Sequence, residues 1–403
     1  MATLLCVWEL GGNLGHLSNL RLPVEIALQQ GHRVVMALKE LQHVKLVFGD
    51  LPIQCIQAPH RTAGIPLEPA GIPSFTHLLI RQCFSSVDEL SGYLRTWGDI
   101  YDSVKPDLVL FEHSPTALIA AHHRRFKKIL IGNGFTAPPI QSDASEPFLP
   151  FPTTLRSQQV WEGLRQDDGE VCKLINAALT RLALPEIPNV HAIYAQADTS
   201  FLMTWPVLEH FGPRPNARYL GVESPRPQPA PPWPKGSGPL VFGYLQPFLS
   251  IELLLRGLMA QNARAVLFVR HLPEAVRHSY ANTRLVFVDA PVDLQIVAQQ
   301  ADWVINHGNH STAAHFVVSG VPQLLIPQHQ EQLFLVQNLV AQGVATMAFQ
   351  DQTSFTAPLR ALEMDPGYRL RARQLAQQCG PYDTQAVSDA IHREFDLLLK
   401  GAM

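Results

Sequence analysis

The chain has 403 residues, more than one hydrophobic core usually holds, so two domains are expected. Hydrophobic residues make up 46%, which is enough for two cores, whereas charged residues make up 16% and the formal net charge is -3. This near balance of charge argues against a nucleic-acid partner.

The chain begins with a short apolar run over residues 4–8, which we interpret as a first β-strand. A basic flank and a cleavage site are missing there, and the run is far shorter than the roughly 20 residues of a membrane span. The turn that follows contains the glycines Gly11, Gly12 and Gly15. His16 then stands at the start of a predicted helix over residues 17–30. The spacing departs from the dinucleotide fingerprint GxGxxG, and no acidic residue closes the next strand.

Strand-like apolar runs alternate with helical stretches through both halves of the chain. They lie at residues 4–8, 34–38, 108–111, 128–131 and 200–203, and then at 240–244, 265–269, 285–288, 303–306 and 323–326. Buried strands that alternate with helices form parallel sheets. The sequence therefore predicts an α/β protein with two Rossmann-like domains facing a central cleft, and ligands at the carboxyl ends of the strands.

A proline-rich segment divides these two halves. Residues 222–238 hold six prolines and end in Gly-Ser-Gly, a composition that excludes a helix or a central strand. We predict an interdomain linker there. The predicted domains are then residues 1–221 and 239–380, and residues 381–403 are predicted to form a helix that packs back on the N-terminal domain.

The most specific pattern lies in residues 301–332. A short apolar run ends at residue 306, and a polar turn then opens a helix with His307, Gly308, Asn309, His310, Ser311 and Thr312. A helix start presents free N–H groups and the positive end of the dipole, and serine and threonine hydroxyls add donors. The turn is predicted to bind an anion, most naturally diphosphate. The alternative is an ordinary strand-turn-helix unit with incidental polar residues.

Together with Gly320-Val321-Pro322 and Glu331-Gln332, this turn resembles the donor-binding signature of family 1 nucleotide-sugar glycosyltransferases of the bacterial, natural-product type. Their signature reads HGGxGT, then GVP, then an acidic residue and Gln. The turn at Gly15-His16 is similar to the N-terminal domain of the same enzymes. The resemblance implies a GT-B fold, an N-terminal acceptor domain and a C-terminal donor domain. It also implies a UDP-sugar or dTDP-sugar as donor and a small acceptor.

In that family the histidine at the position of His16 takes the proton of the acceptor hydroxyl. Imidazole suits this role because its pKa lies near neutrality. Glu112, at the end of a predicted strand, stands where the family commonly has Asp as the partner of this histidine. His113 adjoins it and could point into the cleft instead. The roles of His16 and Glu112 each have a structural alternative: His16 could cap or pack a helix, and Glu112 could cap the helix that follows it.

On the donor side the resemblance implies that His307 contacts the diphosphate from a surface-facing turn. Glu331 and Gln332 match the pair that holds the sugar hydroxyls, and a carboxylate beside an amide suits neighbouring OH groups. The alternative is that Glu331 and Gln332 are ordinary residues of a surface loop and do not contact the sugar.

Three donor-side positions depart from the family pattern. His315 stands where the family has a ribose-binding Glu, and the segment ending in Val292 replaces the aromatic residue and Gln of the base site. Gly243 and Gln246 replace a serine-containing turn, and backbone N–H groups there are expected to cradle phosphate. The identity of the base therefore stays open between a uridine and a deoxythymidine donor.

No DxD carboxylate pair follows a strand, and no His/Cys cluster has metal-ligand spacing, so we expect catalysis without a metal or another cofactor. The predicted activity is inverting glycosyl transfer to a hydroxyl of an apolar or aromatic small molecule. The alternatives are a nucleotide-sugar 2-epimerase of the same fold and a degenerate family member that binds or activates a partner. Five cysteines without CxxC spacing favour reduced thiols in the cytoplasm. The sequence does not indicate an oligomeric state.

Overall fold

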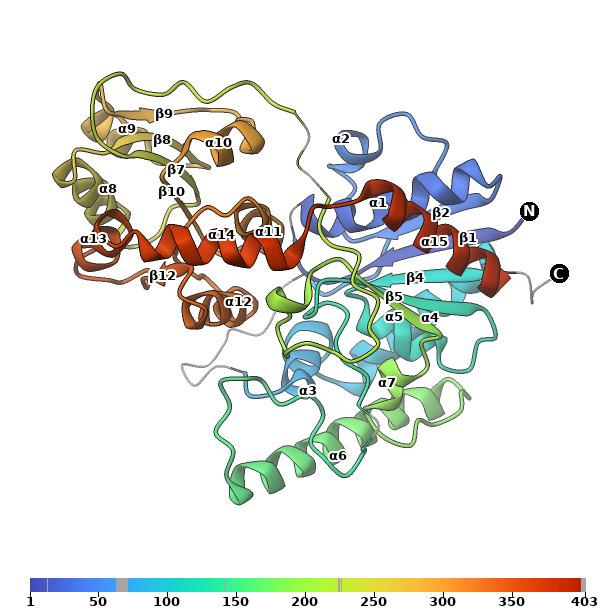
Figure 1. The fold of residues 1–403 in the computed structure, drawn as a ribbon. Helices are drawn as coiled ribbons and strands as arrows, with labels where there is room; N and C mark the ends of the chain where they lie inside the picture. Colours follow the sequence, from blue (N-terminus) through green and yellow to red (C-terminus); the bar gives the residue numbers. More distant parts are fainter. Residues whose placement is uncertain (13, 63–71, 142, 224, 226, 400–403) are drawn as a thin grey trace. The chain divides into compact units, whose positions relative to one another are not determined.

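The computed structural model describes residues 1–12, 14–62, 72–141, 143–223, 225 and 227–399. The chain forms two compact α/β units (Figure 1). Unit 1 comprises Met1–Thr204, Pro213–Leu220 and Asp383–Met403, and unit 2 comprises Trp205–Gly212 and Gly221–Tyr382. Asn13 in the predicted glycine turn, and Ser224 and Arg226 in the predicted linker, lie outside the described residues.

Six parallel strands form the sheet of unit 1, in the order β3-β2-β1-β4-β5-β6. Their bounds are β1 Thr3–Trp8, β2 Arg33–Leu38, β3 Gln54–Gln57, β4 Leu108–Glu112, β5 Lys127–Gly132 and β6 Thr199–Leu202. The register pairs Trp8 with Glu112, so the carboxyl ends of β1 and β4 lie side by side. The strand order reverses between these two strands, and doubly wound sheets bind ligands at such a switch point.

The helices of unit 1 are α1 Leu14–Gln29, α2 Val44–Phe48, α3 Phe75–Leu78, the π-helix η1 Leu79–Cys83, α4 Val87–Val104, α5 Pro115–Ala121, α6 Gln158–Arg181, α7 Ala192–Ala195 and α15 Thr384–Leu399. Helix α1 begins earlier than the predicted residue 17 and buries Leu17, Leu20 and Val24 against the sheet. Helix α15 runs along α1 (Figure 1). The last helix therefore belongs to the same unit as the first strand.

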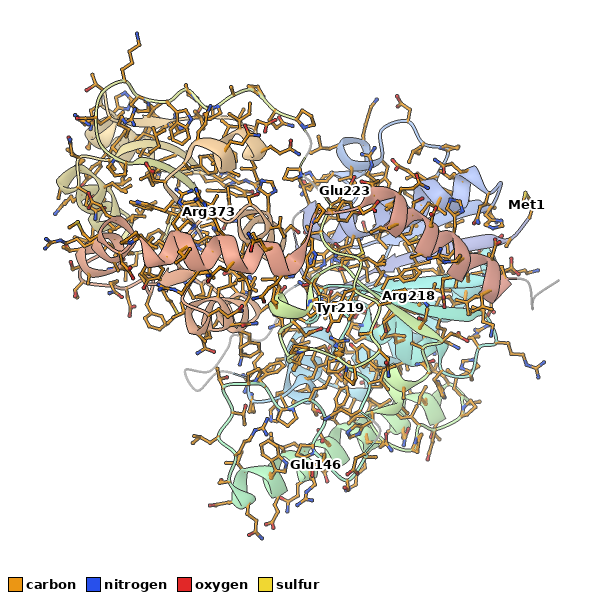
Figure 2. The ribbon with its side chains drawn as sticks, viewed as in Figure 1. Met1, Glu146, Arg218, Tyr219, Glu223 and Arg373 are labelled. Atoms are coloured by element: carbon orange, nitrogen blue, oxygen red, sulfur yellow. The ribbon has the colours of Figure 1, made fainter. Side chains whose placement is uncertain are left out.

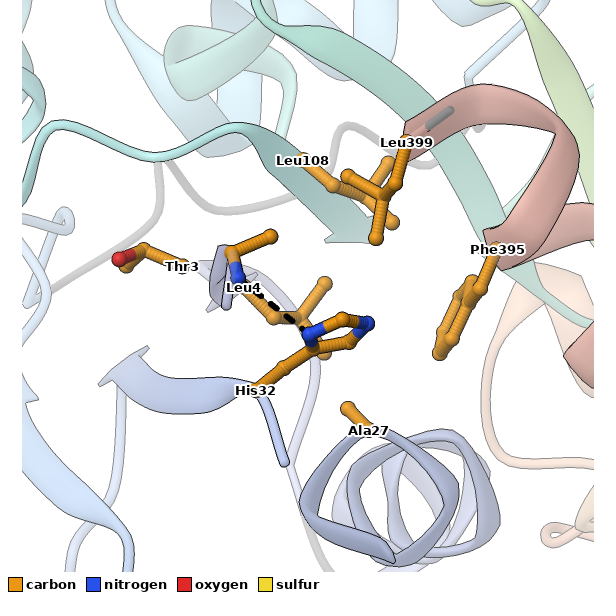
Figure 3. Close-up of a pocket in the computed structure, with 8 residues that line it drawn as sticks. Thr3, Leu4, Ala27, His32, Leu108, Phe395 and Leu399 are labelled. Carbon is orange, nitrogen blue, oxygen red and sulfur yellow. Dashed lines mark hydrogen bonds between the residues drawn. The ribbon is translucent and has the colours of Figure 1, made fainter. Parts of the chain in front are cut away.

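Two further features of unit 1 lie beside α15, a charged contact and a narrow gap. Arg218 (Figure 2) forms an ion pair with Glu394 of α15, and its guanidinium carbon lies 6.0 Å from the centre of the Phe201 ring. A narrow gap at the amino ends of β1 and β4 is bounded by α15 (Figure 3). It is lined by Ala2, Thr3, Leu4, Ala27, His32, Leu108, Phe395 and Leu399. Ligands of doubly wound sheets bind at the opposite edge, so we interpret this gap as a packing defect.

Unit 2 repeats the sheet topology of unit 1, with the order β12-β11-β10-β7-β8-β9. Its strands are β7 Leu240–Leu245, β8 Arg264–Val269, β9 Leu285–Phe287, β10 Trp303–Asn306, β11 Gln323–Leu325 and β12 Ala345–Met347. Its helices are η2 Pro206–Leu208, a 3-10 turn, and α8 Ile251–Ala260, α9 Glu274–Tyr280, α10 Leu294–Gln300, α11 His310–Val318, α12 Gln330–Ala341, α13 Thr356–Met364 and α14 Gly367–Cys379. The switch point of this sheet lies between β7 and β10.

The predicted fold class is confirmed, and each of the ten predicted strands is present with ends that differ by at most one residue. The prediction missed β3 and β12, which are the outer strands on one side of each sheet. β3 is largely exposed and β12 has only three residues, so neither produces a buried apolar run in the sequence.

The proline-rich segment packs against unit 2. Its described residues contain neither helix nor strand. Asp293, at the start of α10, accepts a hydrogen bond from Gln228 N–H (3.0 Å), and Pro229 O accepts one from Asp293 N–H (2.9 Å). The indole of Trp233 donates to Gln300 (2.6 Å). These contacts tie the segment to α10 of unit 2, to which Gly221–Tyr382 belong.

None of the helices within the described ranges combines the length and apolar character that crossing a bilayer requires.

Candidate active site

A histidine and a carboxylate meet at the switch point of unit 1. His16 lies in the first turn of α1, and Glu112 is the last residue of β4. His16 Nδ1 lies 2.7 Å from Glu112 Oε2, and the side chains are 14% and 0% exposed. The Asn19 amide donates to the other carboxylate oxygen (3.3 Å). A carboxylate accepts the Nδ1 proton and leaves the imidazole lone pair on Nε2, the arrangement that a general base requires.

The ring of His16 is held by its neighbours. It stacks on Trp8, with ring centroids 5.2 Å apart. Gly11 has φ +81, and a Cβ atom there would lie 2.1 Å from His16 Nε2, so a side chain at this position would displace the imidazole. A Cβ atom on Gly12 would meet nothing closer than 3.8 Å, and Gly15 is the second residue of α1. Of the predicted glycines, Gly11 has the clearest steric role.

His113 occupies a strained turn beside the His16–Glu112 dyad. Its φ is 43, in the left-handed region that non-glycine residues rarely adopt. Its buried ring stacks on His16 and meets Phe135 edge-on, with centroid distances of 6.0 Å to each. The carboxylate that bonds to His16 Nδ1 is that of Glu112, so the geometry favours Glu112 over His113 as the partner of His16.

His307 lies at the corresponding switch point of unit 2, but its ring is enclosed. Its Nδ1–H donates to the Ile326 carbonyl (2.7 Å), and its Nε2 accepts the Gln246 N–H (2.8 Å). The side chain is 1% exposed, and burial lowers its pKa below the ordinary value of 6.5. The expectation of a surface-facing turn here is therefore wrong. Both ring nitrogens join strand ends of unit 2 to one another, and the N–H group of Gln246 is likewise committed.

Two buried amides that the sequence reasoning missed hold this turn. Asn306 accepts the Gly308 N–H (2.8 Å) and donates to Gln323 (2.8 Å), which donates to the Ala313 carbonyl (2.9 Å). Gly308 has φ +80, and a Cβ atom there would lie 2.6 Å from Val336 of α12. The signal that could have revealed the network is an amide at the end of one apolar strand and the start of the next, because buried amides need partners.

Gln332 is also occupied within unit 2. Its Nε2 donates to Asn309 Oδ1 (2.8 Å), its Oε1 accepts the Gln328 N–H (2.7 Å), and its side chain is buried. Glu331, in the first turn of α12, is partly exposed. Of the pair expected at the sugar hydroxyls, the geometry leaves Glu331 as the better candidate.

The start of α11 retains the features of an anion site. His310, Ser311 and Thr312 are its first three residues, and the N–H groups of a first turn have no partner within the helix. Ser311 is exposed and Thr312 is partly exposed. His310 is buried beside His210, with ring centroids 5.7 Å apart. Burial, and next the positive charge of His210, lower the pKa of His310 to about 3, so that it is neutral at physiological pH.

Three predicted donor-binding residues instead have packing roles. His315 is buried, its Nε2–H donates to the Leu294 carbonyl (3.1 Å), and burial lowers its pKa. Val292 belongs to the apolar core around Phe242. Gly243 lies within β7, where a Cβ atom would come 2.6 Å from Leu267. His315 and Val292 are therefore buried side chains of unit 2, and Gly243 could offer a ligand only its backbone.

Among the residues that the structure describes, no group of three or more His, Cys, Asp or Glu side chains has the geometry of a metal site.

Comparison with known proteins identifies the fold. No protein-family model and no curated protein sequence matches the chain. Solved structures do match over nearly the full length. The glycotransferase of kitacinnamycin gives a TM-score of 0.68 at 19% identity and covers 97% of this chain and 98% of its own. The calicheamicin glycosyltransferase CalG4 gives 0.69 at 15% identity, with 99% and 98% covered.

A third match, the glycosyltransferase VinC, was solved in complex with dTDP and gives a TM-score of 0.60 at 15% identity, with 97% of this chain and 100% of its own covered. Because the matched chains carry the two-domain GT-B architecture along their whole length, the class of fold is established: this chain has the GT-B fold. At such low identity the matches establish the fold alone.

Proposed function

We propose that the protein is an inverting glycosyltransferase that needs no metal. It would move a sugar from a dTDP-sugar or UDP-sugar to a hydroxyl of a small apolar or aromatic acceptor. The observation that carries the proposal is the 2.7 Å hydrogen bond between His16 and the fully buried Glu112, at the end of the sheet where ligands bind.

In the proposed reaction the acceptor oxygen attacks the anomeric carbon on the face opposite the diphosphate. A carbon–oxygen bond to the acceptor forms as the bond to the diphosphate breaks, so the configuration inverts. His16 Nε2 takes the hydroxyl proton, and the Glu112 carboxylate stabilises the imidazolium. The electron pair of the broken bond leaves on the nucleoside diphosphate.

Unit 2 would hold that leaving group. The first turn of α11 would supply backbone N–H groups and the hydroxyls of Ser311 and Thr312 to stabilise the negative charge that develops on the diphosphate. Two similar chains, VinC and the spinosyn rhamnosyltransferase SpnG, were solved in complex with thymidine diphosphate, which supports a deoxythymidine donor. Glu331 would contact the sugar. The five cysteines form no disulfide, which fits a reaction in the reducing cytoplasm.

The proposal is tested by incubating the purified protein with UDP-sugars and dTDP-sugars, with and without a panel of alcohols and phenols. Acceptor-dependent release of nucleoside diphosphate supports transfer. A sugar that is altered while still attached to its nucleotide identifies a 2-epimerase. Nucleotide binding without either reaction identifies a binding or activator protein. His16→Ala should be impaired with the aliphatic alcohols of the panel.

A further inference from the structure

Glu9 is a buried carboxyl group next to the dyad that the proposed reaction does not use. It directly follows β1, and its side chain is 1% exposed. Its Oε2 accepts the N–H groups of Thr116 (3.0 Å) and Ala117 (3.4 Å), in the first turn of α5. The indole of Trp97 donates to the Thr116 hydroxyl oxygen (2.9 Å), which holds that turn from the other side.

The same two loops are joined a second time nearby. Leu10 N–H donates to the His113 carbonyl (3.0 Å). His113 is the residue whose backbone is strained, and it directly follows Glu112. Strain of this kind persists only where surrounding contacts impose it. The bonds of Glu9 and Leu10 are among the contacts that hold this turn.

We propose that Glu9 is a positioning residue: its carboxyl group holds the loop after β4 against the loop after β1, and so keeps Glu112 within hydrogen-bond distance of His16. The predicted loss of turnover rests on the proposed function. The predicted loss of the His16–Glu112 hydrogen bond does not depend on it. Burial raises the pKa of Glu9 from 4.5 to about 8. A neutral amide should therefore replace it well near neutral pH.

The chain offers a matched control. Asp107 also joins the two segments, but at the amino ends of β1 and β4: its Oδ2 accepts the Thr3 N–H (2.7 Å). Asp107→Ala removes a carboxylate bond between the same two segments, on the edge of the sheet away from His16. A general loss of stability would affect both variants alike, whereas loss of positioning would affect Glu9→Ala alone.

The first measurement is kinetic, with dTDP-glucose and UDP-glucose as donors and either benzyl alcohol or 4-nitrophenol as acceptor. Glu9→Ala should lower kcat for benzyl alcohol on the order of 10²-fold, the usual cost of a displacement of about 1 Å. The loss for 4-nitrophenol should be much smaller, because an ionised phenol needs no base. Glu9→Gln should restore activity, and the KM for the donor should stay unchanged. Equal losses for the two acceptors would overturn the proposal.

The second measurement needs no substrate. In protein with ¹⁵N-labelled histidine, the His16 Nδ1 proton bound to a carboxylate should resonate at low field, and His16→Ala assigns it. The signal should disappear in Glu9→Ala and remain in Glu9→Gln and Asp107→Ala. If Glu9→Ala does not fold, Glu9→Asp is measured, since it keeps the carboxyl group but shortens its reach. A signal that persists in Glu9→Ala, or in Glu9→Asp where that variant is measured instead, refutes positioning. Absent turnover with the expected spectra refutes only the transferase.

Discussion

His16 and His307 lie at the switch points of two sheets of the same topology, His16 after β1, the first strand of its unit, and His307 after β10, the fourth strand of its unit, and their surroundings differ. Each histidine follows the carboxyl end of a strand at a switch point. His16 bonds through Nδ1 to a carboxylate and keeps a partly exposed ring. His307 bonds through both nitrogens to the backbone and is buried. The comparison shows that the kind of partner, a carboxylate for His16 and the backbone for His307, and the exposure of the ring separate a candidate base from a structural clamp, a histidine whose ring joins strand ends.

The largest effect on turnover is expected from a substitution of His16, and its absence would contradict the contrast with His307. His16→Ala should lower turnover on the order of 10²–10⁴-fold, the usual contribution of a positioned proton acceptor, with little change in donor affinity. The assay needs an aliphatic alcohol as acceptor, because an acidic phenol would hide the loss. Glu112→Gln should cost less, since it acts on the imidazole at second hand.

A matched control for this change is His278→Ala. His278 Nδ1 also lies near a carboxylate, Glu274 Oε1 (3.0 Å), but both side chains are largely exposed. The control should keep full activity. An active His16→Ala variant with an aliphatic acceptor would remove His16 from the mechanism and direct attention to His113.

His307→Ala should cost stability as well as donor affinity. The substitution leaves the buried Ile326 carbonyl without its partner, at about 1–3 kcal/mol, whereas the N–H of the exposed Gln246 can bond to water instead. Urea denaturation should therefore show a free energy of unfolding lower by about 1–3 kcal/mol, whereas His16→Ala should change it little. Calorimetric titration with dTDP and UDP should show weaker binding. Unchanged stability of His307→Ala would show that the clamp contributes nothing.

The buried His310 at the start of α11 predicts an acid-sensitive unit 2. The pKa of His310 lies at about 3 in the folded chain and near 6.5 when unfolded. A folded pKa below the unfolded value means that stability is fully present above pH 6.5 and is lost as the pH falls toward 3. The expected loss is roughly 1.4 kcal/mol per pH unit. Urea unfolding of wild type and His310→Asn between pH 7.5 and 4.5 tests this, and parallel pH profiles would contradict it.

The smallest expected effect is that of chelation. Turnover should persist in excess EDTA, because the first turn of α11 and its hydroxyls are expected to stabilise the leaving diphosphate. If EDTA abolishes turnover and Mg²⁺ restores it, a metal ion stabilises the leaving diphosphate, and that ion would need a carboxylate ligand.

The sequence by itself determined the α/β class, the ten buried strands and the turns at which polar groups gather. Such features are local: apolar runs of strand length and glycine-rich turns are readable without knowing what packs against them. It could not show β3 and β12, the amide network of Asn306 and Gln323, or the buried places of His315 and Val292, because these depend on neighbours distant in the chain.

Tertiary structure decided the role of each histidine. The partners of His16 and His307 lie far along the chain, at Glu112 and at Gln246 and Ile326, and strand order and register bring them together. A hydrogen bond forms only within about 3 Å, so a shift of one residue in register would exchange partners without altering any local pattern. For that reason the sequence located both turns, and only the packed sheets distinguished the dyad from the clamp.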